Sequence, residues 1–276
     1  MKNFHGTSVT GTMAEAKGDA QLTASLYLAT ATDSEKETMA LLHASVDTKG
    51  CREYSTDAYA RLRFVRARPK KPEQAVAMYE EAIAWRREYG ADAFAGHGGA
   101  EGGADGGADG GVDGGAAAEV GVGQGAEVRA IRVEVLAPCP VVQAYYSVAW
   151  CGPDPEGRPV LVMRFNRTDF PGILRESTME HLFARNVALY EEALRLYRGA
   201  QFVAVIDINT ATFVKDTNVG SWIKCMLRFV KALSKLEAYY PEVIYKIAFV
   251  NQPWMFGAVW RMIKPFLAAA TVRKVR

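Results

Sequence analysis

The sequence lacks an apolar run long enough to cross a membrane, which takes about 20 residues. The richest apolar stretch, residues 244–267, is interrupted by polar residues and prolines: Lys246, Asn251, Gln252, Pro253, Arg261, Lys264 and Pro265. The N-terminus has no apolar core of a secretory signal either. We therefore expect a cytoplasmic protein without a membrane-spanning segment.

Cysteine and histidine are scarce, with four of each. The cysteines, Cys51, Cys139, Cys151 and Cys225, form no CxxC pair and have no histidine at zinc-finger distance, so we expect reduced thiols and no metal site. The motifs of serine hydrolases, zinc proteases, P-loop NTPases and protein kinases are missing as well. The sequence therefore predicts no catalytic residue. An enzyme with a nonstandard site stays an alternative, but no group of candidate catalytic residues supports it.

The chain also lacks an excess of either charge, because its 276 residues include 33 Lys and Arg against 31 Asp and Glu. The sequence also has no RNA-binding motif of aromatic and basic residues. Together, the balanced charge and the missing motif argue against a nucleic-acid partner. A hydrophobic content of 49% excludes a disordered chain and suffices for one sizeable core. Basic residues are concentrated in residues 224–276, which hold ten Lys or Arg and two Glu. That concentration indicates an anionic surface or an anionic small ligand.

Two segments of low complexity delimit the structured parts. Residues 1–32 are small and polar with little periodicity, which predicts a disordered tail. Residues 91–127 include the repeats GGAE, GGAD, GGAD, GGVD and GGAA. Such a tract cannot bury enough apolar area to offset its ordering entropy, so we expect a flexible Gly- and Asp-rich linker.

Residues 33–90 predict a small helical unit. Helical periodicity occurs in residues 33–46 and 57–66, and again from Pro72 to a stop at Gly90. Asp33 or Ser34 is expected to cap the first of these helices.

Residues 128–276 predict an α/β lobe. Three short apolar runs, residues 160–165, 202–206 and 244–250, are typical of buried strands in a largely parallel sheet. Helices are expected between them, one of which begins at a capping box formed by Ser177 and Glu180. The fold class is therefore α/β, with a small N-terminal helical unit and a mixed, largely parallel sheet lobe with flanking helices.

A basic stripe is expected on the helix around residues 222–235. Lys224, Arg228, Lys231 and Lys235 follow at i, i+4, i+7 and i+11, which places all four on one helical face. Such a stripe is either a solvated face or a docking surface for anionic membranes.

The segment 253–267 predicts a helix with apolar residues around nearly its whole circumference. A helix of this kind must be covered on all sides. Two interpretations stay open: a plain core helix, or a helix with protein on one face and lipid on the other.

Seven motifs, taken in order, resemble the CRAL-TRIO family of lipid-binding proteins, in particular its phosphatidylinositol transfer type. They are Leu62-Arg-Phe-Val-Arg-Ala-Arg68, Trp85-Arg-Arg-Glu-Tyr-Gly90, Glu156-Gly-Arg-Pro-Val160, Ile206-Asp207, Tyr240-Pro-Glu242, Asn251-Gln-Pro-Trp254 with Lys264-Pro-Phe-Leu267, and Thr271-Val-Arg-Lys274. The resemblance covers about residues 33–276. Because members usually continue with a further strand, the lobe is expected to be incomplete at its C-terminus.

The resemblance implies an apolar lipid pocket closed by a gate helix, residues 253–267. Members hold one lipid there and exchange it between membranes, without covalent chemistry and without a cofactor other than the lipid. The resemblance assigns the lipid headgroup to Arg68, Glu242, Thr271 and Lys274. It assigns the gate helix and pocket to Trp254, Phe256, Val259, Trp260, Ile263, Phe266, Phe202, Ala204 and Ile206.

The expected ligand is phosphatidylinositol or a phosphoinositide, bound by a cytoplasmic monomer that visits anionic membranes. Phe202 and Ala204 stand where members that also take phosphatidylcholine have hydroxyl residues. The alternative function for the same fold is a lipid-sensing adaptor or signalling module that does not transfer its lipid.

Overall fold

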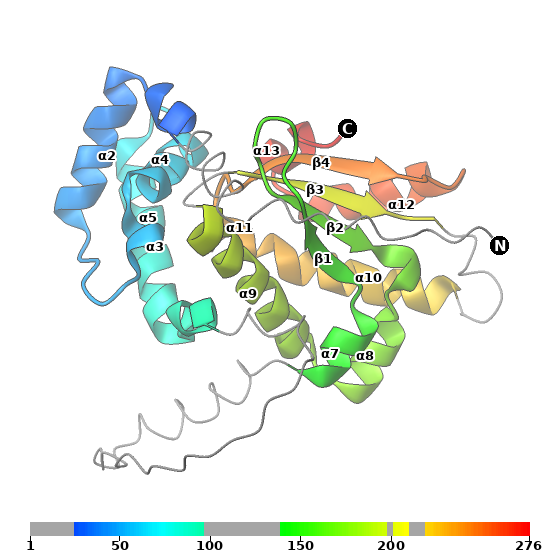
Figure 1. Ribbon diagram of the computed structural model, residues 1–276. Helices are drawn as coiled ribbons and strands as arrows, with labels where there is room; N and C mark the ends of the chain where they lie inside the picture. Colours follow the sequence, from blue (N-terminus) through cyan, green and yellow to red (C-terminus); the bar gives the residue numbers. More distant parts are fainter. Residues whose placement is uncertain (1–24, 97–138, 198–200, 210–218) are drawn as a thin grey trace, which may run out of the picture.

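The computed structural model describes residues 25–96, 139–197, 201–209 and 219–276, which form a helical unit beside an α/β lobe (Figure 1). The predicted fold class is confirmed. Most of the predicted tail, residues 1–24, most of the predicted linker, residues 97–127, and the start of the predicted lobe, residues 128–138, lie outside the described residues.

The helical unit consists of α2 (Asp33–Ser45), α3 (Glu53–Thr56), α4 (Ala58–Ala67) and α5 (Pro72–Tyr89). Thr32, rather than Asp33 or Ser34, caps α2, because its hydroxyl accepts from the amide of Glu35 while the Glu35 carboxylate accepts from the amide of Thr32. The apolar faces of α2, α4 and α5 meet in one core, formed by Leu42, Val46, Phe64, Val65, Ala75, Tyr79, Ala82 and Ile83.

Ordered structure extends beyond both expected ends of this unit. Residues 25–29 are helical, and Tyr27 lies beneath the guanidinium of Arg66 at 4.4 Å from the ring centre. At the other end, η1 (Ala91–Gly96) is a 3₁₀ helix that packs on the lobe. The side chains of Ala91 and Phe94 are buried there, which explains why the first residues of a Gly-rich segment are ordered.

The lobe contains a four-stranded sheet in the order β1-β2-β3-β4. Its strands are β1 (Val148–Cys151), β2 (Val160–Arg164), β3 (Phe202–Asp207) and β4 (Ile244–Val250). The three predicted strands pair in parallel, whereas β1 pairs with β2 antiparallel and was not expected from the sequence. The mixed sheet therefore has the predicted, largely parallel character.

The long helices α9 (Met179–Tyr197) and α10 (Val219–Ser234) lie along one face of this sheet (Figure 1). Phe202 of β3 packs edge to face on Tyr190 of α9, at 5.4 Å between ring centres. The start of α9 differs from the prediction, since the hydroxyl of Thr178, not that of Ser177, accepts from the amide of His181. Three short helices complete this part of the lobe: α7 (Pro140–Tyr145), η2 (Phe165–Arg167) and α8 (Phe170–Glu176).

The chain after α10 alternates between the two parts of the molecule. α11 (Leu236–Tyr239) packs against α5 of the helical unit, and β4 follows. Then come α12 (Phe256–Ile263), η4 (Lys264–Phe266) and α13 (Ala269–Arg273). The last residues lie beside β4, where Ile247 donates to the carbonyl of Lys274 and accepts from the amide of Arg276, both at 2.9 Å.

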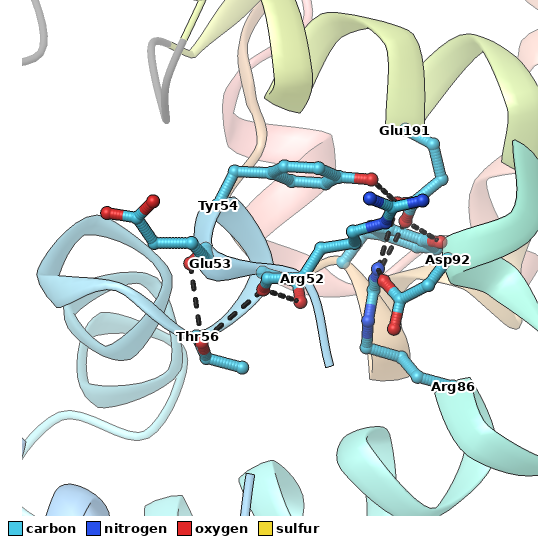
Figure 2. A network of polar contacts seen from close by, with 9 residues as sticks. Arg52, Glu53, Tyr54, Thr56, Arg86, Asp92 and Glu191 are labelled. Carbon is cyan, nitrogen blue, oxygen red and sulfur yellow. Dashed lines mark hydrogen bonds and ion pairs between the residues drawn. The ribbon is translucent and has the colours of Figure 1, made fainter. Parts of the chain in front are cut away.

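A buried polar network joins the helical unit to the lobe (Figure 2). The fully buried carboxylate of Glu191, on α9, accepts two hydrogen bonds from Arg86 of α5 at 2.7 and 2.8 Å. It also accepts from the hydroxyls of Tyr54 at 2.9 Å and Tyr240 at 2.5 Å. Asp92 of η1 pairs with the same arginine at 2.5 Å. Every strong acceptor position of Glu191 is thus filled by a donor, as a buried charge requires.

Burial and the nearby Glu191 carboxylate both raise the pKa of the Tyr240 and Tyr54 hydroxyls, so these groups stay protonated as donors. Burial on its own would lower the pKa of Arg86, but Glu191, Tyr240 and Asp92 together more than offset it, and the pKa is raised. The Arg86 guanidinium therefore remains charged within the protein interior.

Aromatic stacking reinforces the same junction. The ring of Trp85, on α5, stacks on Tyr239 at 4.1 Å and 5° between planes, and meets Tyr240 edge to face. Tyr239 packs against the cores of both parts. The segment 239–240 is therefore fixed by polar and apolar contacts together.

Replacing Glu191 with Leu should lower the free energy of unfolding by about 3–5 kcal/mol, because Arg86 would stay buried without its main partner. Chemical denaturation measures the loss, and the conservative Tyr54→Phe should cost about 1.5–3 kcal/mol, for one hydrogen bond to a charged group. Glu80→Gln, at an exposed position on α5, is the matched control and should change little. A Glu191→Leu protein as stable as this control would contradict the central role of the network.

Candidate functional site

A cavity of about 300 Å³ lies where the end of α4, α11, the start of β4 and α13 meet. All four residues that the resemblance assigns to the headgroup, Arg68, Glu242, Thr271 and Lys274, line this cavity. They come from three segments far apart in the sequence. Arg66, Tyr240 and Glu237 line it as well.

Lys274 and Glu242 form an ion pair on the wall of the cavity. The distance from Lys274 Nζ to Glu242 Oε2 is 2.7 Å, and the side chains are 18% and 20% exposed. Partial burial makes such a pair stronger than one in bulk water. The backbone pairing of Lys274 with β4 holds the lysine at this place.

The neighbouring residues determine the position of Glu242. Tyr240 is anchored on Glu191, Pro241 is buried, and Gln201 donates to the carbonyl of Glu242 at 2.7 Å. Glu242 itself has a positive φ of 55°, which is uncommon for a residue with a side chain. Strained backbone of this kind persists only where the surroundings determine it, and it is frequent at functional sites.

Thr271 is held by Glu237, a residue that sequence analysis did not identify. The Thr271 hydroxyl donates to Glu237 Oε1, and the amide of Ala268 donates to Glu237 Oε2 at 3.2 Å. Glu237 thereby attaches α11 to the start of α13. Its position five residues before Glu242 was the only sequence signal, and that signal is too weak to be read alone.

Two arginines of the segment 62–68 have different environments. Arg66 donates to Glu35 at 3.0 Å and to Thr30 at 2.9 Å, and it covers the ring of Tyr27. Arg68 is exposed, donates to the carbonyl of Ala67 at 3.0 Å, and forms no ion pair with the residues that the structure describes. Arg66 is therefore engaged in structure, whereas Arg68 is available to a ligand.

The predicted gate helix is shorter than expected and only partly covered. Phe256 and Trp260 of α12 pack on Phe249 of β4, with ring centres 4.9 and 5.7 Å apart, and Ile263 is buried. Val259 also packs against the core. On the outer side, Trp254 is 96%, Met262 43% and Phe266 37% exposed. The apolar residues of this segment therefore reach solvent on one side, which differs from the plain core helix that was one of the two interpretations.

The predicted pocket residues of β3 lie in the core. Phe202 and Ala204 are buried, and the ring of Phe202 contacts Trp150 and Tyr190. Ile206 is partly buried and packs against the same core. None of the nine residues assigned to gate and pocket lines the cavity beside Lys274.

Other kinds of site find no support in the described part of the chain. No helix there is long and apolar enough to span a membrane. No three His, Cys, Asp or Glu side chains of those residues are grouped so that they could hold a metal ion. All four cysteines are free.

Comparison with known proteins connects this geometry to a family. Residues 143–276 match the CRAL/TRIO domain family. The chain is 25% identical over 224 residues to the phosphatidylinositol/phosphatidylcholine transfer protein SFH9 of Arabidopsis thaliana, a match that covers 79% of this chain and 32% of SFH9. It is also 25% identical over 218 residues to the Sec14 cytosolic factor of Schizosaccharomyces pombe, covering 78% of this chain and 64% of that protein. The chain thus spans less than two thirds of the length of either relative.

The fold is similar to that in the crystal structure of Sfh5. The two share a TM-score of 0.55 at 17% sequence identity, with 89% of this chain and 80% of that chain covered.

The different environments of Arg66 and Arg68 lead to a test of stability. Arg66→Leu should lower the free energy of unfolding by about 1–2 kcal/mol, since it removes two hydrogen bonds and a cation–π contact. Arg68→Leu should stay within about 0.5 kcal/mol of the unaltered protein, as expected for an exposed side chain. Equal losses in urea unfolding would show that Arg68 is also a structural residue.

Proposed function

We propose that the protein binds one phospholipid with an anionic headgroup, phosphatidylinositol or a phosphoinositide, and transfers it between membranes, because residues 143–276 match the CRAL/TRIO domain family. The observation that supports this proposal is the meeting of Arg68, Glu242, Thr271 and Lys274 at one cavity. On this proposal the protein is a cytoplasmic monomer and performs no covalent chemistry.

The four side chains have the chemistry that an inositol phosphate requires. Lys274 and Arg68 supply positive charge and donors to the phosphate, and Arg68 has five N–H groups in a fixed planar arrangement. Thr271 supplies a neutral donor, and Glu242 accepts from an inositol hydroxyl. Charge-assisted hydrogen bonds of this kind are the strong ones in ligand recognition.

The acyl chains need an apolar space, which we place under α12. In the structure Phe256 and Trp260 occupy the surface of Phe249 directly. An outward movement of α12 would expose these rings and Ile263 to an incoming lipid. The helix would then act as a gate, with its inner side toward the lipid and its outer side toward the bilayer.

The outer surface around α12 fits an anionic membrane. Trp254, Met262 and Phe266 present apolar side chains to solvent, and α10 packs against α12 and η4. The four residues of the basic stripe are all exposed: Lys224, Arg228 and Lys231 lie on α10, and Lys235 follows directly after it. Apolar side chains beside basic ones are typical of surfaces that dock on anionic lipid.

A second function deserves a test because the relatives SFH9 and Sec14 cytosolic factor are longer than this chain. In a longer protein the same lobe can sense a lipid and present it without releasing it. Vesicle-to-vesicle transfer of a fluorescent phosphatidylinositol separates the two functions. Transfer supports the first function, and binding without transfer supports the second.

Lys274→Ala should weaken phosphatidylinositol binding roughly ten- to a hundredfold, since a lost charge-assisted contact to phosphate costs on the order of 1.5–3 kcal/mol. Lys49→Ala, at an exposed position of the helical unit, is the matched control and should bind normally. Thermal melting checks that both variants are folded. Unchanged binding in a folded Lys274→Ala protein would exclude this headgroup assignment.

Reversal of three stripe residues, Lys224, Lys231 and Lys235, to Glu should weaken sedimentation with anionic vesicles, because each basic residue near such a surface contributes about 1 kcal/mol. The difference should shrink as salt increases, since surface charges are screened. Reversal of Lys36, Lys49 and Arg52, exposed residues of the helical unit, changes the net charge equally and serves as the control. If both triple variants sediment alike at low salt, the basic stripe is merely a solvated face.

A further inference from the structure

Glu237 occupies a part of the candidate headgroup site that a ligand would need. It lines the cavity together with Thr271, Glu242 and Lys274. Both of its carboxylate oxygens accept hydrogen bonds, one from the Thr271 hydroxyl and one from the amide of Ala268. Two donors from the start of α13 thus fix the carboxylate against Thr271.

This contact uses the only proton that Thr271 can donate. A hydroxyl has a single O–H, so it cannot donate to Glu237 and to a phosphate at the same time. Thr271 can therefore serve as a phosphate donor only after Glu237 has released it. The structure shows the site with this donor already occupied by the protein itself.

The charge of Glu237 is also less compensated than that of Glu242. Glu242 is paired with Lys274 at 2.7 Å, whereas Glu237 accepts from two neutral groups and forms no ion pair with the described residues. A phosphate bound at Thr271 would lie close to a second negative charge. Like charges at such short range disfavour each other.

We propose that Glu237 is a specificity-determining residue that lowers the affinity of this site for headgroups with a net negative charge by competing for Thr271 and by repelling the phosphate. The inference rests on the proposed function. It predicts that removal of the charge strengthens binding, the opposite of what the loss of a merely structural contact would do.

The test compares Glu237→Gln with Glu81→Gln, which removes one carboxylate from an exposed position on α5 outside the cavity. Three probes are used: phosphatidylinositol in phosphatidylcholine vesicles, phosphatidylcholine vesicles alone, and soluble glycerophosphoinositol. Glu237→Gln should bind the phosphatidylinositol vesicles about tenfold more tightly, as expected from removal of one neighbouring like charge. Phosphatidylcholine binding should not change, and the same gain for the soluble headgroup would locate the effect at the phosphate rather than at the membrane surface.

Thermal melting of both variants controls for folding, and Thr271→Val in the two backgrounds tests the competition directly. Without the Thr271 hydroxyl, the gain from Glu237→Gln should become smaller. Equal phosphatidylinositol binding by Glu237→Gln and Glu81→Gln would overturn this inference and leave the proposed function intact. Absence of phosphatidylinositol binding in the unaltered protein and in all variants would overturn the proposed function, and the inference with it.

Discussion

The buried ion pair between Glu191 and Arg86 is the interaction on which the rest of the structure depends. A carboxylate with no solvent exposure is unfavourable unless donors surround it, and four hydrogen bonds from Arg86, Tyr54 and Tyr240 meet that requirement. Three of these bonds cross from the helical unit to the lobe. Since removing one partner leaves the other charge buried and unpaired, the two parts cannot separate without exposing the network to water.

The same network determines the geometry of the candidate site. Tyr240 donates to Glu191, and Glu242 follows it by two residues along the chain. On the other side of Tyr240 in the chain, Tyr239 is restrained by its stacking on Trp85. A carboxylate buried far from solvent thus holds the segment that places Glu242 opposite Lys274. The left-handed backbone of Glu242 is maintained by these contacts rather than by its own preference.

Much of the fold was predictable because periodicity reports which residues face a core. The helices at 33–45, 58–67 and 72–89 and the strands β2, β3 and β4 correspond to the predicted segments. β1 was not identified, since its four residues are too few to show an alternating pattern. The order in η1 depends on the burial of Ala91 and Phe94 against the lobe, which local composition does not reveal.

The site was predictable only in part, because motifs identify residue types but not their partners. Arg68, Glu242, Thr271 and Lys274 were proposed from resemblance, and the structure brings them to one cavity. Their immediate partners come from tertiary contact: Glu237 lies 34 residues before Thr271, and Glu191 lies 105 residues after Arg86. One signal for Glu191 was present, an acidic residue beside Tyr190 and Leu194 in an apolar helical pattern. A charge at such a position predicts a buried partner without naming it.

The charges of the site are balanced within the protein itself. Lys274 is neutralised by Glu242, and the donor of Thr271 is taken by Glu237, so Arg68 is the one predicted cation on the cavity wall without an ion pair among the described residues. An anionic ligand would therefore meet Arg68 and the exposed Arg273, which also lines the cavity, and would have to displace carboxylates from Lys274 and Thr271. Binding is then an exchange of one set of charge-assisted contacts for another, and the net gain in free energy is the difference between them. Because of this exchange, Lys274 and Thr271 keep hydrogen-bond partners when no ligand is bound. The affinity of the site for an anionic ligand then depends on each carboxylate that the ligand displaces.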